Sequence, residues 1–139
     1  MIKKIEIERF KSIQHVELNL GKVNVLVGAN NSGKSSILQA IQFATSVAQT
    51  SQMSVKAPKF SKDGTMPTSV YPNQLIYSPV KDPYTLAHGG VLKEDEAQAI
   101  RVSFTDDSGE SVIATFEKVR IKISQQILQV WKLGKDFYR

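Results

Sequence analysis

The residue types that could do chemistry in this chain gather in residues 28–36, whose sequence is GANNSGKSS. Gly28, Gly33, Lys34 and Ser35 occupy every fixed position of the phosphate-binding pattern G-x-x-x-x-G-K-[ST]. The glycines allow backbone turns that a Cβ would forbid, so that successive N–H groups can face one anion. The lysine can then reach the outer phosphates of a nucleotide, and the serine hydroxyl can ligate Mg²⁺. The pattern therefore predicts a phosphate-binding loop (P-loop) with Ser35 as its metal ligand.

A P-loop needs a strand before it and a helix after it, and the flanking sequence predicts both. Residues 22–28, KVNVLVG, are rich in valine and leucine, as a buried strand would be. Beyond Gly33, apolar residues recur with helical spacing, and the start of such a helix adds unpaired N–H groups and a positive dipole end. The apolar face consists of Ile37, Ala40, Ile41, Ala44, Val47 and Ala48. A glycine- and serine-rich turn that binds nothing is the alternative, and this context argues against it.

Alternating apolar and polar residues predict four more strands. Residues 2–10 and 15–20 alternate on either side of the turn sequence KSI. Residues 100–104 and 112–116 alternate on either side of DDSG, a typical turn sequence. Each pair is therefore expected to lie side by side, the second pair as a hairpin.

The two remaining segments are less regular. Residues 50–80 hold four of the five prolines and many serines and threonines, which predicts a long surface loop with QLIYS as a short strand within it. Residues 119–133 could supply one or two further strands, or a helix over residues 125–133.

The bulk composition is that of a soluble globular domain, with 41% hydrophobic and 22% charged residues among 139. The absence of cysteine excludes disulfides and thiolate metal sites. No apolar run has membrane-spanning length, and the N-terminus lacks the pattern of a signal peptide, so we expect a cytoplasmic protein. The net charge of +5 hides an acidic stretch over residues 81–117 and a basic one over 118–139. A solvated face explains the basic stretch better than a nucleic-acid surface does.

The N-terminal sequence resembles the start of ABC-class ATPases of the SMC, RecF and OLD type. These include many prokaryotic AAA family ATPases of DNA repair and anti-phage systems. The resemblance is carried by Phe10-Lys11-Ser12, by the paired strands, by Asn30, Asn31 and Ser36 in the P-loop, and by ILQAI after it. It is strong over residues 1–45, weaker over residues 84–118 and absent over residues 50–80.

The resemblance implies an α/β P-loop NTPase fold of the ABC-ATPase type. Residues 1–139 would form an incomplete N-terminal lobe, with a mixed sheet, one main helix after the P-loop, an antiparallel β-hairpin region, and residues 50–80 as a long loop or insertion. It also implies ATP and Mg²⁺ as ligands, and in the family the residues matching Lys11 and Ser12 lie beside the nucleotide. The expected cofactor-binding residues are Lys11, Ser12, Gly28, Asn30, Asn31, Ser32, Gly33, Lys34, Ser35 and Ser36.

The resemblance also implies partners for the complete protein. The family works as a homodimer of ATPase heads, with ATP between the P-loop of one head and the signature motif of the other. A nuclease partner, a fused nuclease domain and DNA are further partners that it suggests. A membrane is not among them.

The chain departs from the family where hydrolysis needs a carboxylate. A Walker B strand should be an apolar run that ends in Asp, because it is buried in a parallel sheet. The nearest candidate, IRVSFTDD, ends in Asp106 and Asp107 but alternates like a half-exposed strand. LAHGG (residues 86–90) is only superficially similar to a signature motif, and His88 is interpreted as structural. We therefore expect the chain alone to bind ATP with negligible turnover, as part of an ATPase or as a non-catalytic, ATP-dependent assembly module.

Two other P-loop classes fit the sequence less well. A GTPase would need D-x-x-G after a strand, and DDSG matches it only in letters at a predicted turn. It would also need N-K-x-D for guanine, which the sequence lacks. A small-molecule kinase would need lid and substrate arginines, and none is evident among the four arginines.

Overall fold

The computed structural model of the chain describes residues 1–53, 62, 64–68, 72–90, 92, 96–117 and 121–125. The strands are β1 Ile2–Phe10, β2 Ile13–Asn19, β3 Thr65–Thr68, β4 Ile100–Asp106, β5 Ser111–Phe116 and β6 Ile121–Gln125. The helices are α1 Lys34–Met53 and the short 3₁₀ helices η1 Pro72–Gln74, η2 Pro83–Leu86 and η3 Glu96–Gln98.

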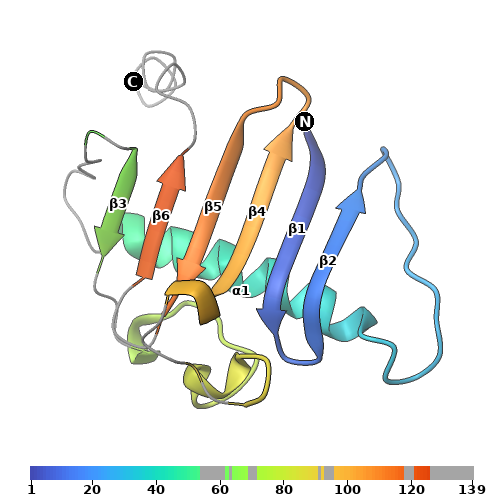
Figure 1. Cartoon of the computed structure of the whole chain (residues 1–139), viewed down its shortest axis with the longest axis horizontal. Coiled ribbons are helices and arrows are strands. Elements are labelled where there is room, and N and C mark those ends of the chain that lie inside the picture. Colours follow the sequence, from blue (N-terminus) through green and yellow to red (C-terminus); the bar gives the residue numbers. More distant parts are fainter. Residues whose placement is uncertain are drawn as a thin grey trace.

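The strands form one sheet in the order β2-β1-β4-β5-β6-β3 (Figure 1). The two strand pairs expected from alternation are present as β1–β2 and β4–β5, and the hairpin over DDSG is confirmed. Every strand pair in the described part of the chain is antiparallel, so the expected mixed sheet is wrong for these residues. The sheet lacks a parallel strand because the segment before the P-loop does not join it.

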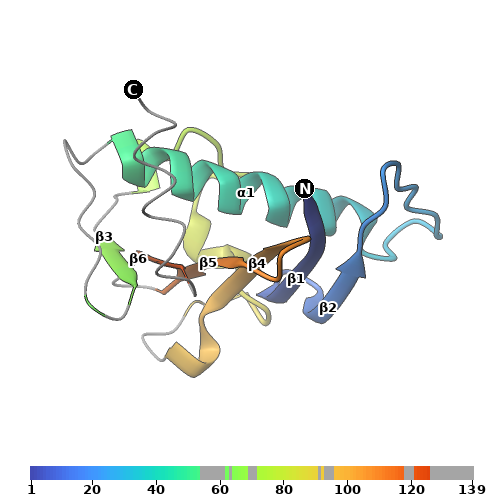
Figure 2. The same cartoon turned by 90° about the horizontal axis from the view of Figure 1, so that it is seen from above.

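Helix α1 covers one face of the sheet and leaves the other face open (Figure 2). Apolar side chains at alternate positions of each strand line the covered face. Ile5 of β1 lies opposite Phe104 of β4, and Ile7 lies opposite Val102. The open face presents mostly polar side chains from the alternate positions. The sheet thus has a core side, which fixes the register of its strands.

Aromatic rings of three elements meet at the centre of this core. Phe43 of α1 lies 6.1 Å from Phe10 of β1, ring centre to ring centre. It lies 5.2 Å from Phe116 of β5 in an edge-on arrangement. All three are at least 95% buried. The expected apolar helix face is confirmed by buried Ala40, Ala44 and Val47, but it omitted Phe43, which lies three residues after Ala40 and four before Val47 and so belongs on the same face.

The segment that includes η1 is tied to the helix instead of the sheet. Buried Ser46 accepts a hydrogen bond from the Tyr77 N–H at 2.7 Å, and buried Thr50 accepts one from the Ile76 N–H at 3.2 Å. The expected strand at QLIYS is therefore wrong, since these N–H groups bond to helix side chains and not to a neighbouring strand. The expected long loop is interrupted by β3 and η1, and α1 takes up its first four residues, to Met53.

Residues 22–27 are the largest departure from expectation, because they form no strand and lie in solvent. Val23, Val25 and Val27 are 84%, 78% and 88% exposed. The chain leaves the sheet at Gly21, where the Asn24 side chain accepts from the Gly21 N–H at 2.8 Å and donates to its carbonyl at 3.1 Å. Figure 1 shows this trace running beside the β2 edge to the start of α1. No described strand pairs with it, and a strand requires a partner for its backbone groups.

Of the expectations for the C-terminal segment, one strand is present as β6, while residues 126–133 lie outside the described residues. Among the described helices, none is both long and apolar enough to cross a membrane.

Candidate functional site

The P-loop connects the exposed segment to α1 through a turn of the backbone at residues 30–31. Asn31 and Gly33 have φ angles of 67° and 92°, in the left-handed region. Asn is one of the few residues with a side chain that visits this region readily, and Gly pays no steric penalty there. The Ser32 N–H donates to the Ala29 carbonyl at 3.2 Å, and the first helical bond joins the Ile37 N–H to the Gly33 carbonyl at 2.9 Å. The helix therefore begins directly at the loop, as expected.

Gly28 is required for a reason other than its φ angle. A Cβ at this position would lie 2.6 Å from the Ser32 hydroxyl oxygen and 3.3 Å from the Ser32 Cβ. The loop thus folds back so closely that a Cβ at this position would force the Ser32 side chain to shift. The expectation that both glycines serve unusual backbone angles holds for Gly33, while Gly28 allows a close approach.

The Lys34 ammonium is folded over the loop and caps its carbonyls. It donates to the Gly28 carbonyl, to the Ala29 carbonyl at 2.6 Å and to the Ser32 hydroxyl at 3.2 Å. These are local acceptors, five or six residues before the lysine in the case of the carbonyls. The positive charge is thus held within the bend of the loop, where it can exchange these neutral acceptors for anionic oxygen.

The other expected P-loop residues surround this lysine at the surface. Asn30, Asn31 and Ser32 are exposed, as is Ser35 in the first turn of α1, whereas Ser36 is half-buried. Exposure leaves the hydroxyl of Ser35 open to a metal ion. The glycine cradle, the lysine and the helix N-terminus together fit an anionic phosphate with its cation.

Lys11 lies in the β1–β2 turn and is held at three points. Its N–H donates to the Leu86 carbonyl at 2.6 Å, and its carbonyl lies 2.8 Å from Nδ1 of His88. Its ammonium donates to Oε1 of Gln39 in α1 at 2.6 Å. The structure therefore joins Lys11 to the P-loop helix. Ser12, its expected companion, is exposed in the same turn.

The backbone on both sides of Phe10 is strained. Arg9 and Lys11 have φ angles of 57° and 51°, in the left-handed region that costs a residue with a Cβ about 1–2 kcal/mol. Phe10 between them is fully buried and pairs with Ala87 in an isolated antiparallel bridge. The packing of this ring and the contacts of Lys11 maintain the strained turn. Such strain is concentrated at functional sites in many proteins.

Two residues at this junction were not expected among the site residues. His88 touches Lys11 through a ring nitrogen, and since a carbonyl only accepts, Nδ1 carries the proton and donates. The His88 N–H also donates to the Arg9 carbonyl at 2.9 Å, which agrees with a structural interpretation of this histidine. Gln39 was missed because a glutamine in a helix has no signal of its own until its partner is known.

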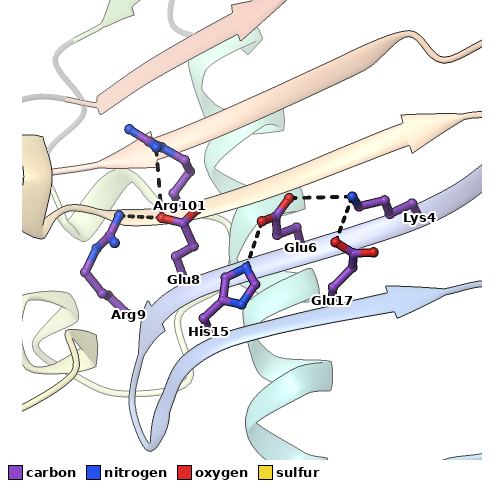
Figure 3. A network of polar contacts seen from close by, with 7 residues as sticks. All are labelled: Lys4, Glu6, Glu8, Arg9, His15, Glu17 and Arg101. Carbon is purple, nitrogen blue, oxygen red and sulfur yellow. Dashed lines mark hydrogen bonds and ion pairs between the residues drawn. The ribbon is translucent and has the colours of Figure 1, made fainter.

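The open face of the sheet carries a network of charged side chains across β1, β2 and β4 (Figure 3). Lys4 pairs with Glu17 at 2.8 Å, His15 with Glu6 at 2.7 Å, and Arg9 with Glu8 at 2.6 Å. The hydrogen bond from His15 is the main reason that the pKa of Glu6 lies below its usual value.

This network includes three groups with metal-ligating atoms, from Glu6, Glu8 and His15, all within 4.8 Å of one another. Each carboxylate already faces a cationic or hydrogen-bonding partner, Glu8 additionally facing Arg101 at 3.9 Å. The balanced charges identify a surface network across strands and not a cation site.

Asp106 ends β4 and Asp107 begins the β4–β5 turn. The Asp106 carboxylate accepts from the Ser108 hydroxyl at 2.6 Å, the Ser108 N–H at 2.8 Å and the Glu110 N–H at 3.0 Å. Asp107 pairs with the N-terminal ammonium at 3.2 Å. Both carboxylates thus have structural partners, in agreement with the rejection of this strand as a Walker B element.

The family of the chain follows from its sequence. A family model described as AAA ATPase domain matches residues 1–127. Because this match covers most of the chain, the protein belongs to the AAA ATPase domain family.

Two individual proteins show local or loose similarity. An uncharacterised protein of Methanocaldococcus jannaschii is 39% identical over 57 residues, which is 40% of this chain and 26% of that protein. The match thus spans about a quarter of the relative's length. A solved structure from work on ATP-driven dimerization and DNA-stimulated activation of SMC ATPases aligns with 85% of this chain and 70% of its own, at 22% identity and a TM-score of 0.32.

Proposed function

We propose that this chain binds ATP with Mg²⁺ through residues 28–36 and forms the N-terminal lobe of an ATPase head. The observation that supports this most directly is the Lys34 ammonium, held inside a glycine-bounded loop at the start of a helix. Membership of an ATPase family supports the same proposal.

The roles of the residues follow from their types and places. Lys34 exchanges loop carbonyls for phosphate oxygens, and the N–H groups at the start of α1 add donors for the same anion. Ser35 would hold Mg²⁺ through its hydroxyl, and the metal would offset the negative charge of the phosphates. Gly28 and Gly33 keep the loop narrow enough for these groups to converge.

We further propose that hydrolysis requires residues outside these 139. Phosphoryl transfer needs a carboxylate that holds the metal or orients water. Within the described part of the chain, Asp106 and Asp107 are bound up in the β4–β5 turn. The completing elements would come from further chain, and a second ATPase head would supply the signature motif, as the resemblance to SMC-type ATPases implies.

Isothermal titration of wild type, Lys34→Ala and Ser35→Ala with ATP, in the presence and absence of Mg²⁺, tests the binding site. Lys34→Ala should weaken binding about tenfold or more under both conditions, because a charge-assisted contact is lost. Ser35→Ala should weaken binding only when Mg²⁺ is present. Equal affinity of wild type and Lys34→Ala would reject the site, and an unaltered Mg²⁺ dependence in Ser35→Ala would reject the metal assignment.

A further inference from the structure

The two edges of the sheet differ in how well they are protected against pairing with another strand. Unpaired backbone groups at an edge form a template for a further strand, and natural edges are commonly shortened or interrupted by proline. β3, at one edge, has four residues and includes Pro67. β2, at the other edge, has seven residues without proline and keeps one register with β1 along its length. β2 is therefore the edge to which a strand can be added.

Every second residue of β2 turns its backbone N–H and C=O groups away from the sheet. The Leu20 N–H, directly after β2, donates to the Lys3 carbonyl beside β1 at 2.7 Å. Because hydrogen-bonded pairs alternate along an antiparallel ladder, the N–H groups of Val16 and Leu18 also point to β1. The outward-facing groups belong to the residues between and beside them: His15, Glu17 and Asn19. Within the described residues, nothing accepts from or donates to these outward backbone groups.

The chain that follows β2 does not extend the sheet. Figure 2 shows it rising from the level of the sheet to the level of α1. The side chains of His15 and Glu17 are exposed on the open face of the sheet (Figure 3), whereas those of Val16 and Leu18 are half-buried on the helix side. An added strand therefore meets apolar side chains on one face and polar side chains on the other.

The sequence of β2 is complementary to a second copy of itself. If two copies pair antiparallel about a two-fold axis at the middle residue, Val16, all seven residues have a partner. His15, the only basic residue of β2, then lies opposite Glu17 of the second copy, the only acidic one. Both residues have outward backbone groups, which is what a hydrogen-bonded pair requires. Moving the axis by one residue would instead place Glu17 opposite Glu17, or His15 opposite His15.

We propose that the β2 edge is an interface between two copies of this chain, formed by antiparallel pairing of β2 with β2 about Val16. The two sheets become one continuous sheet, and both α1 helices lie on the same side of it because the axis is perpendicular to the sheet. The assembly closes at two copies, since the same edge is used by both. The interface uses neither residues 28–36 nor a nucleotide, so the inference stands independently of the proposed ATP binding.

Sedimentation velocity of the full chain over a concentration series, without nucleotide or Mg²⁺, tests this interface. The wild-type mass should rise from 15.4 kDa toward twice that value as the concentration increases. His15→Glu and Glu17→Lys should each raise the dimer dissociation constant roughly tenfold, because two-fold symmetry makes each unfavourable pair occur twice. Gln42→Glu and Gln42→Lys are the controls, which add a charge of either sign to an exposed position of α1 and should dimerise as wild type does.

A mixture of the two β2 variants gives the sharpest result, because each is mismatched with itself and complementary to the other. In a mixed pair the carboxylate introduced at position 15 faces the ammonium introduced at position 17, and the original His15 faces the original Glu17. Mixed dimers should therefore form with about the wild-type dissociation constant. Such a recovery also shows that the loss in each single variant is not a failure to fold.

Three outcomes would overturn the inference. The first is a wild type that stays monomeric throughout the concentration series, and the second is a pair of β2 variants that dimerise as well as wild type. The third is an association that both β2 variants retain and Val25→Ser abolishes, which would assign the contact to residues 22–27. Thermal unfolding establishes that each variant is folded. If a charge variant does not fold, Asn19→Pro removes an outward N–H without a change of charge and should also weaken the dimer.

Discussion

Asp106 ends the sequence that comes nearest to a Walker B motif, yet its carboxylate serves as a hydrogen-bond acceptor in the β4–β5 turn. Three donors from Ser108 and Glu110 converge on Asp106. The hydrogen bond from the Ser108 hydroxyl is the largest reason that the pKa of Asp106 lies below its ordinary value of 3.8. All three bonds go to Oδ1, so this oxygen is committed to the turn.

This role of Asp106 predicts a pH-dependent loss of stability. A lowered folded-state pKa means that the carboxylate stabilises the fold above pH 3.8 and loses that contribution as the pH falls through the folded pKa. Asp106→Ala should thus be less stable than wild type at pH 7, and the difference should shrink below pH 3.8. Urea unfolding at both pH values measures it. A loss of ATP affinity in this variant, with stability unchanged, would contradict the structural role and restore the metal-ligand interpretation.

Among the elements, the segment containing η1 depends on two hydroxyls of α1 for its position. The buried Ser46 hydroxyl accepts from the Tyr77 N–H, so Ser46→Ala leaves a partly buried donor without that acceptor. We expect a loss of about 1–3 kcal/mol in the free energy of unfolding. Thr45→Ala is the matched control, because Thr45 is exposed and its hydroxyl donates to the Ile41 carbonyl of the same helix. Equal stability of the two variants in denaturant unfolding would show that the segment is held by other contacts.

The elements that sequence predicted well are those whose signal is local. Alternation placed β1, β2 and the β4–β5 hairpin, and helical spacing together with the P-loop placed α1. The strand predicted at QLIYS is absent because two helix hydroxyls, 26 and 31 residues earlier in the chain, accept hydrogen bonds from N–H groups of this segment. Such a pairing cannot be deduced from the segment itself.

In the candidate site too, sequence predicted the local features and missed the contacts between distant residues. The motif predicted the loop around Lys34, since its glycines and lysine have fixed spacing. It did not predict that Gly28 serves a close approach to Ser32, nor that Gln39 holds Lys11. Both facts depend on side chains that meet only after the chain folds. The strand predicted for residues 22–27 is absent for a third reason, because a strand cannot form without another strand beside it.

For the whole molecule, the exposed valines 23, 25 and 27 provide the decisive test. These three side chains are about four-fifths exposed. They lie directly before the P-loop, where a strand is expected to be buried in a parallel sheet. We therefore expect a neighbouring strand to cover them. We expect residues 22–27 to exchange amide hydrogens rapidly in the 139-residue chain and slowly in a longer natural chain that supplies the neighbouring strand. Hydrogen-exchange mass spectrometry of both chains, with α1 as the internal reference, measures this. Slow exchange of residues 22–27 in the 139-residue chain would show that the segment has a partner within it.

A comparison of the 139-residue chain with a longer chain also tests where ATP hydrolysis takes place. The 139-residue chain should bind ATP with negligible turnover, because Lys34 and the loop amides would position phosphate while Asp106 and Asp107 are engaged by the β4–β5 turn and the N-terminal ammonium. The longer chain should hydrolyse ATP, with a rate per head that rises with protein concentration if two heads must meet. An ordinary ATPase rate from the 139-residue chain, lost in Asp106→Asn or Asp107→Asn, would contradict this, because it would place the hydrolytic carboxylate in the β4–β5 turn.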